Sequence, residues 1–290
     1  MSPAATAAAR AEARPPTAWS RIDPRWFSSS LLTLIIVIGQ WKAQIIGDNY
    51  VGWLVALGTA LAVEQLLSRL LRGRFVNALS AYISGNSVAF LVKASGGILW
   101  PYWLCSAVSI GSKYVLSYRG RHLWNPTNFG VCALLLLAPA QVSMLSHQWS
   151  NSLAIVAIIW GAGSLTVWRA RVWHITLGYL TCFALLAVAR SAITGAAVLT
   201  ELAPCTGAMY QLFMFFMVTD PRTIVSGKKR QLVVVAIVAL VECLIRLALD
   251  FHRIGPPLEY APPMFALFLV GPVALWLELR SKPAAPPRAG

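Results

Sequence analysis

Long stretches of apolar residues, separated by short polar or basic turns, run along most of this chain. Nearly charge-free runs are Leu31–Gly39, Val51–Val63, Val131–Pro139, Leu153–Trp160, Leu232–Val241 and Phe265–Trp276. A bilayer core requires about 20 predominantly apolar residues of a helix, and lipid offers no partner for backbone N–H and C=O groups. The pattern therefore predicts an all-α, polytopic integral membrane protein with about ten transmembrane helices.

The apolar pattern also predicts where these helices lie and how they are grouped. We expect them at residues 27–46, 50–71, 82–92, 100–118, 126–145, 150–168, 173–193, 207–218, 231–250 and 260–279. The third and eighth are too short to span a bilayer at about 1.5 Å per residue, and they begin alike, at Ser84-Gly85 and Thr206-Gly207. Short segments at matching places predict two inverted five-helix halves, residues 26–145 and 146–280.

Composition and charge agree with a membrane protein. Of the residues, 58% are hydrophobic and 12% charged, against about 25% charged in a soluble chain. The net charge is +14, and the charged residues lie between the apolar runs. This placement indicates membrane topology and not a nucleic-acid partner. If both termini are cytoplasmic, most Lys and Arg residues lie on the cytoplasmic side of the membrane. The exceptions are Lys42, Lys93, Arg190, Arg246 and Arg253. Residues 1–25 and 281–290 are then disordered cytoplasmic tails, the first of them basic.

Common catalytic and metal-binding signatures are missing from the sequence. The five cysteines form no CxxC pair, and the four histidines are not spaced for zinc or haem. The sequence has no Walker A, GxGxxG, HExxH or GxSxG motif. We therefore expect no metal site and no stand-alone catalytic residue.

One candidate site is the stretch Arg119–Gly130, RGRHLWNPTNFG. Asn125 followed by Pro126 is typical of a helix start, so one interpretation is a simple N-cap. The functional alternative adds His122 and Asn128, because amides and backbone N–H groups at a helix start can hold a polar ring edge or a phosphate.

A second candidate is the end of a short apolar segment, FMFFMVTDPRT, residues 213–223. Asp220 precedes Pro221, which ends or kinks the helix. A carboxylate near membrane depth is a functional hypothesis by default. The alternative is an interfacial Asp that pairs with Arg222 or caps the next turn.

Three charged residues within the apolar segments are candidates for an ion or proton site. Glu242 and Arg246 are spaced i, i+4, which favours an internal ion pair. Glu64 has no local partner in the sequence, so it is either a proton or cation site or the partner of Lys113 or Arg246 from another helix.

Four stretches resemble the membrane subunits D of Rnf and B of Nqr, the ion-pumping redox complexes. HLWNPTNFGVCALLLLAP is similar to their NxFNPA helix start, and CTGAMYQLFMFFMVTDPRTIVSGKKRQ to their SGGTMxGAFFMATDPVTSP stretch. WRARVWHITLGYL resembles the basic, His-containing turn after their sixth helix, and SAYISGNSVAFLV their third segment. The order is the same, and the likeness covers roughly Ser80–Leu279.

The resemblance implies ten helices in two inverted halves and a noncovalent flavin, riboflavin or FMN, near the two motifs. It makes Asn125 and Asp220 candidate flavin contacts, with Asn128 and Thr219 beside them and His122 at the place of the family's first Asn. The family's covalent FMN on a Thr of an SGAT loop is not expected. The corresponding loop, about Leu145–Asn151, lacks the motif, and the nearest string, Thr194–Ala197, ends in Ala.

The resemblance implies a membrane redox subunit in the bacterial cytoplasmic membrane that exchanges electrons with redox or biosynthetic partner proteins. Relatives lacking the covalent site resemble a membrane protein of enediyne antibiotic biosynthesis loci, which suggests a natural-product pathway. The residues leave two other classes open. One is an ion-coupled transporter or exporter, because short third segments in inverted halves also occur in transporters. The other is a scaffold that docks biosynthetic enzymes on its basic inner face.

Overall fold

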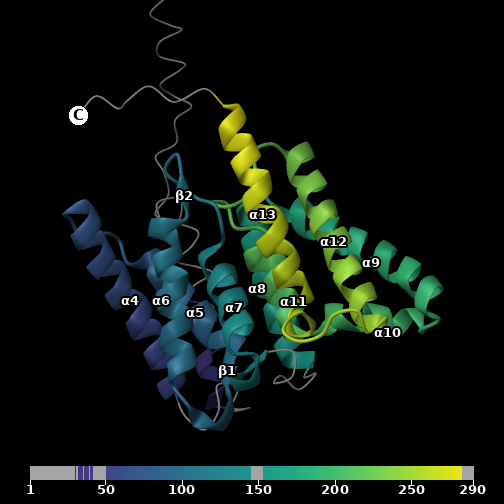
Figure 1. Ribbon diagram of the computed structural model, residues 1–290, viewed down its shortest axis with the longest axis horizontal. Coiled ribbons are helices and arrows are strands. Elements are labelled where there is room, and N and C mark those ends of the chain that lie inside the picture. Colours follow the sequence, from purple (N-terminus) through teal and green to yellow (C-terminus); the bar gives the residue numbers. More distant parts are fainter. Residues whose placement is uncertain are drawn as a thin grey trace, which may run out of the picture.

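The fold is mostly helical. The computed structural model describes residues 50–144 and 153–282, together with Ser30, residues 32–34, residues 36–38, Gln40 and Trp41. Its main helices are α4 (Val51–Arg72), α5 (Leu79–Leu91), α6 (Trp100–Val115), α7 (Pro126–Leu137), α8 (Leu153–Arg169), α9 (Trp173–Thr194), α10 (Val198–Leu202), α11 (Ala208–Leu212), α12 (Lys228–Asp250) and α13 (Pro262–Ser281). Figure 1 shows them as one bundle, with the hairpin at β2 and the strand β1 at opposite ends.

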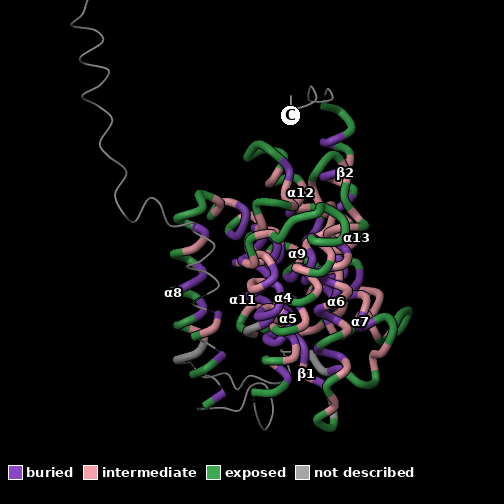
Figure 2. Tube along the Cα trace, turned by 90° about the vertical axis from the view of Figure 1, so that its left-hand side faces the viewer, coloured by how far each residue is buried: buried purple, intermediate pink, exposed green. Residues whose placement is uncertain are grey.

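Four of the described helices, α4, α9, α12 and α13, are long and apolar enough to cross a membrane. Large apolar side chains on these helices remain exposed, including Leu70 on α4, Leu185 on α9, Val233 on α12 and Val273 on α13. Figure 2 shows such exposed stretches along the outside of the bundle. Lipid tails solvate these side chains without the cost that water would impose, so the prediction of a membrane protein is confirmed at this level.

Helix α4 turns a stripe of small residues toward its neighbours. The buried positions recur every four residues, and all but Glu64 are small: Gly52, Ala56, Ala60, Glu64 and Ser68. A Cβ at Gly52 would lie 2.8 Å from the ring of Tyr102 on α6. Small residues let helix backbones approach closely, which replaces the hydrophobic driving force that lipid does not provide.

The predicted helix at residues 126–145 is wrong in its second half. Helix α7 has 12 residues and ends at Leu137. The chain continues as a 3₁₀ turn, η2 (Pro139–Gln141), and a strand, β4 (Val142–Met144), which pairs antiparallel with β1 (Val92–Ala94) after α5. Pro139 lacks the N–H that a continuing helix needs. The fold is therefore not purely α-helical.

The two segments predicted to be short are short in the structure. Helix α5 has 13 residues, and α11 has five before it continues as a five-residue π-helix, η5 (Phe213–Met217). A π-helical turn is rare and is frequently found at functional sites. Here it ends three residues before Asp220.

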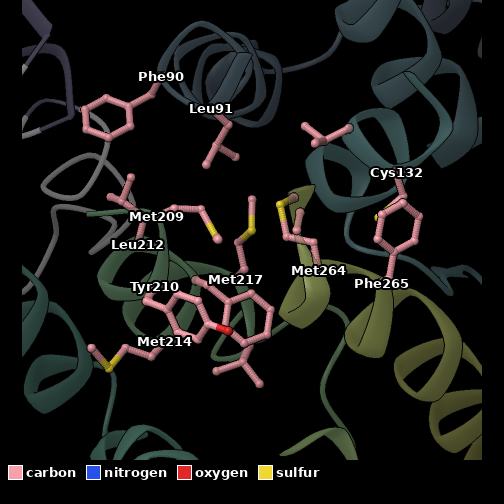
Figure 3. Close-up of a cluster of buried hydrophobic side chains, with 14 of the residues drawn as sticks. Phe90, Leu91, Cys132, Met209, Tyr210, Leu212, Met214, Met217, Met264 and Phe265 are labelled. Atoms are coloured by element: carbon pink, nitrogen blue, oxygen red, sulfur yellow. The ribbon is translucent and has the colours of Figure 1, made fainter. Parts of the chain in front are cut away.

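Both short segments contribute to one central core. Figure 3 shows Phe90 and Leu91 of α5 on one side of Met209, Met217 and Met264, with Tyr210 on the other. Flexible thioether side chains fill irregular gaps, which suits a core built from short, broken helices.

Some sequence predictions fall partly or wholly outside the described residues. The described positions of the first expected helix, at 30, 32–34, 36–38, 40 and 41, are helical. The tail at residues 1–25, residues 283–290 and the loop at 145–152, which corresponds to the family's flavin loop, are not described.

Candidate functional site

A short hairpin and the start of α7 form one side of the candidate site. The strands β2 (Ser117–Tyr118) and β3 (Arg121–His122) pair antiparallel. Arg119 and Gly120 between them have φ of 49° and 78°, as a type I′ turn requires. Asn125 then caps α7, its side-chain oxygen accepting from Asn128 N at 3.0 Å. The N-cap interpretation of Asn125 is confirmed.

Asn125 also reaches the second motif. Its amide nitrogen Nδ2 donates to Asp220 Oδ2 at 3.1 Å. The same oxygen accepts from Thr223 Oγ1 at 3.1 Å, and Oδ1 accepts from Arg222 N at 3.1 Å. Asp220 therefore caps the turn that follows it, as one of the two sequence interpretations predicted. No ion pair joins Asp220 to Arg222 within the described residues.

Further hydrogen bonds hold this end of the bundle together. Asn128 Nδ2 donates to Met264 O at 3.0 Å, and Trp124 Nε1 donates to Phe268 O at 2.9 Å, so α7 is joined to α13. Thr219 bonds back within its own segment, to Phe215 O at 2.6 Å. Of the five predicted contacts, Asn125, Asn128 and Asp220 are linked by hydrogen bonds, and His122 precedes Asn125 by three residues.

Two hollows lie at this end. An open cleft of about 500 Å³ is lined by Gly120, Arg121, His122, Val172, Pro221, Arg222, Ile224, Val225, Ser226 and Gln231. Behind it is a cavity of about 30 Å³, room for one water molecule, with Asn125 and Asn128 in its wall. Ile224, Val225 and Gln231 line both. Only the outer cleft is large enough for a cofactor.

The sequence interpretation missed four of the cleft's polar residues, Arg121, Arg222, Ser226 and Gln231. Arg121 Nη2 donates to Arg222 O at 2.7 Å and to Ile224 O at 3.0 Å, which ties the hairpin to the second motif. Gln231 Nε2 donates to Val225 O at 2.9 Å. Arg121 and Arg222 lie within the two candidate stretches, and Ser226 and Gln231 follow the second, so their closeness to both motifs in the sequence was the available clue.

The positive surroundings influence His122. Its burial lowers the pKa below the ordinary value of 6.5, because the buried imidazolium is poorly solvated. The carboxylate of Asp220 acts in the opposite direction. The charges of Lys113, Arg222 and Arg121 lower the pKa further, and His122 is therefore neutral at pH 7.

The predicted ion-site residues lie in two separate clusters. Glu64 on α4 pairs with Lys113 on α6, and Tyr114 Oη donates to Glu64 Oε1 at 2.9 Å. The predicted partnership with Lys113 is confirmed, and the alternative with Arg246 is wrong. A buried carboxylate needs such partners because its desolvation is costly.

The second cluster joins α9, α11 and α12. Arg246 Nε donates to Glu242 Oε1 at 3.0 Å, which confirms the i, i+4 pair. Tyr179 of α9 and Tyr210 of α11 also donate to the fully buried Glu242. Arg246 lines an open pocket of about 690 Å³ that also contains Asp250. Glu64 and Glu242 are thus each satisfied locally and do not form one site.

Metal ligands do not gather in the described residues, where no group of three or more His, Cys, Asp or Glu side chains could hold an ion. No protein-family model matches the chain, and no curated protein matches it.

Proposed function

We propose that this chain is a membrane electron-transport subunit that holds a noncovalent flavin in the cleft beside Asn125 and Asp220. The observation that supports this most directly is the hydrogen bond from Asn125 Nδ2 to Asp220 Oδ2. It brings together the two motifs that resemble subunits D of Rnf and B of Nqr, although 95 residues separate them.

The cleft fits a flavin in volume and in chemistry. Its 500 Å³ lies within the range of about 300–1,000 Å³ that small-molecule sites occupy. His122 and Ser226 offer hydrogen-bonding groups, and Val172, Ile224 and Val225 offer apolar surface for a ring. Gln231 uses its amide on Val225 O and His174. Asn125 and Asp220 use their polar atoms on each other and on the backbone, so their role is to hold the walls in place.

A bound flavin would supply one- and two-electron transfer, and the protein would fix its position and potential. Neutral His122 can donate or accept a hydrogen bond at the ring edge. The basic side chains around the cleft would favour a reduced, negatively charged ring over a neutral one.

The proposal includes two inverted halves, about ten spans and both termini in the bacterial cytoplasm. In the proposed first half, α4 packs on α6 and α6 packs on α7. In the proposed second half, the corresponding helices pack in the same order, α9 on α12 and α12 on α13. Arg119 bonds to Leu279 O near the end of α13, and Arg121 bonds to Arg222 O, so three basic segments meet at one end: the hairpin, the turn after Asp220 and the last turn of α13. Such a concentration of positive charge favours the cytoplasmic side.

Flavin content is the test. The full-length protein, purified in mild detergent with added flavin, should release near-stoichiometric flavin on acid precipitation. Asp220→Ala and Asn125→Ala should lose it, whereas Glu259→Gln, on the exposed rim of the other pocket, should keep it. A folded protein that never carries flavin would overturn the electron-transfer function.

The buried carboxylates support a second candidate, an ion-coupled transporter. Glu242 is fully buried between α9, α11 and α12, and its partner Arg246 reaches an open pocket. An ionisable group at such depth in a membrane protein often marks an ion or proton route. Proton flux in liposomes containing the protein should then be lost in Glu242→Gln. Equal flux in both proteins would exclude Glu242 from transport.

A further inference from the structure

The cleft has two kinds of lining. Val172, Ile224 and Val225 provide apolar surface. Arg121 and Arg222 provide positive charge beside it, and Arg121 Nη2 donates to Ile224 O at 3.0 Å. A ligand that matches both kinds of lining has a flat, largely apolar part and an anionic group.

The two arginines of the cleft carry positive charge that no ion pair neutralises. Among the described residues, neither Arg121 nor Arg222 lies within ion-pair distance of a carboxylate. Asp220, the nearest acid in sequence, directs its two oxygens to Asn125, Thr223 and the backbone N–H of Arg222. The cleft mouth therefore attracts anions.

The two guanidinium groups differ in mobility. Arg121 is fixed, because its Nε and Nη2 donate to Arg222 O at 3.2 and 2.7 Å and Nη2 also donates to Ile224 O at 3.0 Å. The side chain of Arg222 is exposed, and no hydrogen bond of its guanidinium occurs within the described residues. One fixed and one movable planar donor set can close on a phosphate, for which arginine geometry is suited.

We propose that the cleft selects the phosphorylated flavin, FMN, over riboflavin, with the phosphate at Arg121 and Arg222. This inference rests on the proposed function, because it names the form of flavin that the same cleft takes. Riboflavin ends in a neutral hydroxyl and would leave both guanidinium charges without an anion. The phosphate of FMN carries a charge of about −1.5 to −2 at pH 7.

The experiment compares the two flavins on one protein. Flavin-free full-length protein in mild detergent is titrated with FMN and with riboflavin, and binding is followed by quenching of flavin fluorescence. We expect FMN to bind at least about tenfold more tightly, the effect of one or two charge-assisted hydrogen bonds. Inorganic phosphate should weaken the binding of FMN and leave that of riboflavin unchanged.

Variants locate the effect. Arg222→Gln should weaken FMN binding about tenfold and leave riboflavin binding unchanged. Arg74→Gln is the matched control, because Arg74 is also exposed but lies outside the cleft. Arg222 is exposed, so its replacement leaves the fold intact, and the thermal unfolding midpoint verifies this.

The outcomes separate this inference from the proposed function. Equal affinity for the two flavins, or an Arg222→Gln variant that loses both equally, would overturn the selection of FMN while leaving a flavoprotein. Displacement of FMN by ADP at equal concentration would show a general anion site and would also overturn it. Binding of neither flavin would overturn both proposals.

Discussion

Asn125 and Asp220 are joined by a hydrogen bond of 3.1 Å between side chains that lie 95 residues apart in the sequence. Asn125 uses its oxygen to cap α7 and its nitrogen to hold Asp220, which in turn caps the turn after η5. One pair of side chains therefore fixes the start of one helix relative to the end of a broken one. The cleft lies beside this connection.

Replacing Asp220 should loosen this connection. We expect Asp220→Ala to lower the free energy of unfolding by about 1–3 kcal/mol, because it leaves Asn125 and the backbone N–H of Arg222 without their acceptor. The thermal unfolding midpoint in detergent measures the loss. Thr223→Ala removes one donor to Asp220 and should cost less. An Asp220→Ala protein as stable as the wild type would show that the connection contributes nothing.

Gly130 should not tolerate a side chain, although it lies in the interior of helix α7, where alanine is normally preferred to glycine. A Cβ there would overlap Ser109 Oγ and lie 2.7 Å from Cys105 O, where α7 packs on α6. Gly130→Ala should therefore lower the unfolding midpoint, since the two helices must move apart. Gly111→Ala on α6 is the matched control, because nothing lies within 4 Å of its added Cβ. Equal midpoints for the two variants would contradict the close packing.

The Glu64–Lys113 pair should show strong coupling. Removing one partner leaves an uncompensated buried charge, so Glu64→Gln or Lys113→Met alone should cost about 3–5 kcal/mol. The double variant should be more stable than the sum of the two losses predicts, because both charges are gone. Unfolding midpoints of the four proteins complete the cycle. Strictly additive losses would mean that the two charges do not interact.

Acid should destabilise the protein through His122. Its pKa is lowered in the folded state, so below about pH 6.5 the unfolded chain binds a proton that the folded site disfavours. Stability linked to His122 is therefore present above pH 6.5 and is lost as the pH falls toward the folded-state pKa. The difference between the unfolding midpoints of the wild type and His122→Gln should therefore become smaller as the pH is lowered from 7.5 to 5.5. A difference independent of pH would contradict the lowered pKa.

The prediction of a membrane protein succeeded because it depends on composition along single segments. Each apolar run must be helical in lipid, whatever it packs against. Two local chemical signals also succeeded: the N-cap at Asn125 and the i, i+4 pair of Glu242 and Arg246. Both involve neighbours within one turn of helix. The end of α7 at Leu137 was missed, because the apolar run continues through Pro139 into a strand that pairs with β1.

Sequence alone thus determined which segments are apolar, where basic turns separate them, and which short motifs carry polar groups. These properties depend only on residues that are close together in the sequence, so they can be read from its hydrophobic pattern and charges. Only the tertiary structure decided that Lys113 and not Arg246 neutralises Glu64, that Asn125 holds Asp220, and that Arg121 and Arg222 share one cleft with His122. Each of these depends on how helices far apart in sequence pack, and packing is set by the fit of side chains across helix faces.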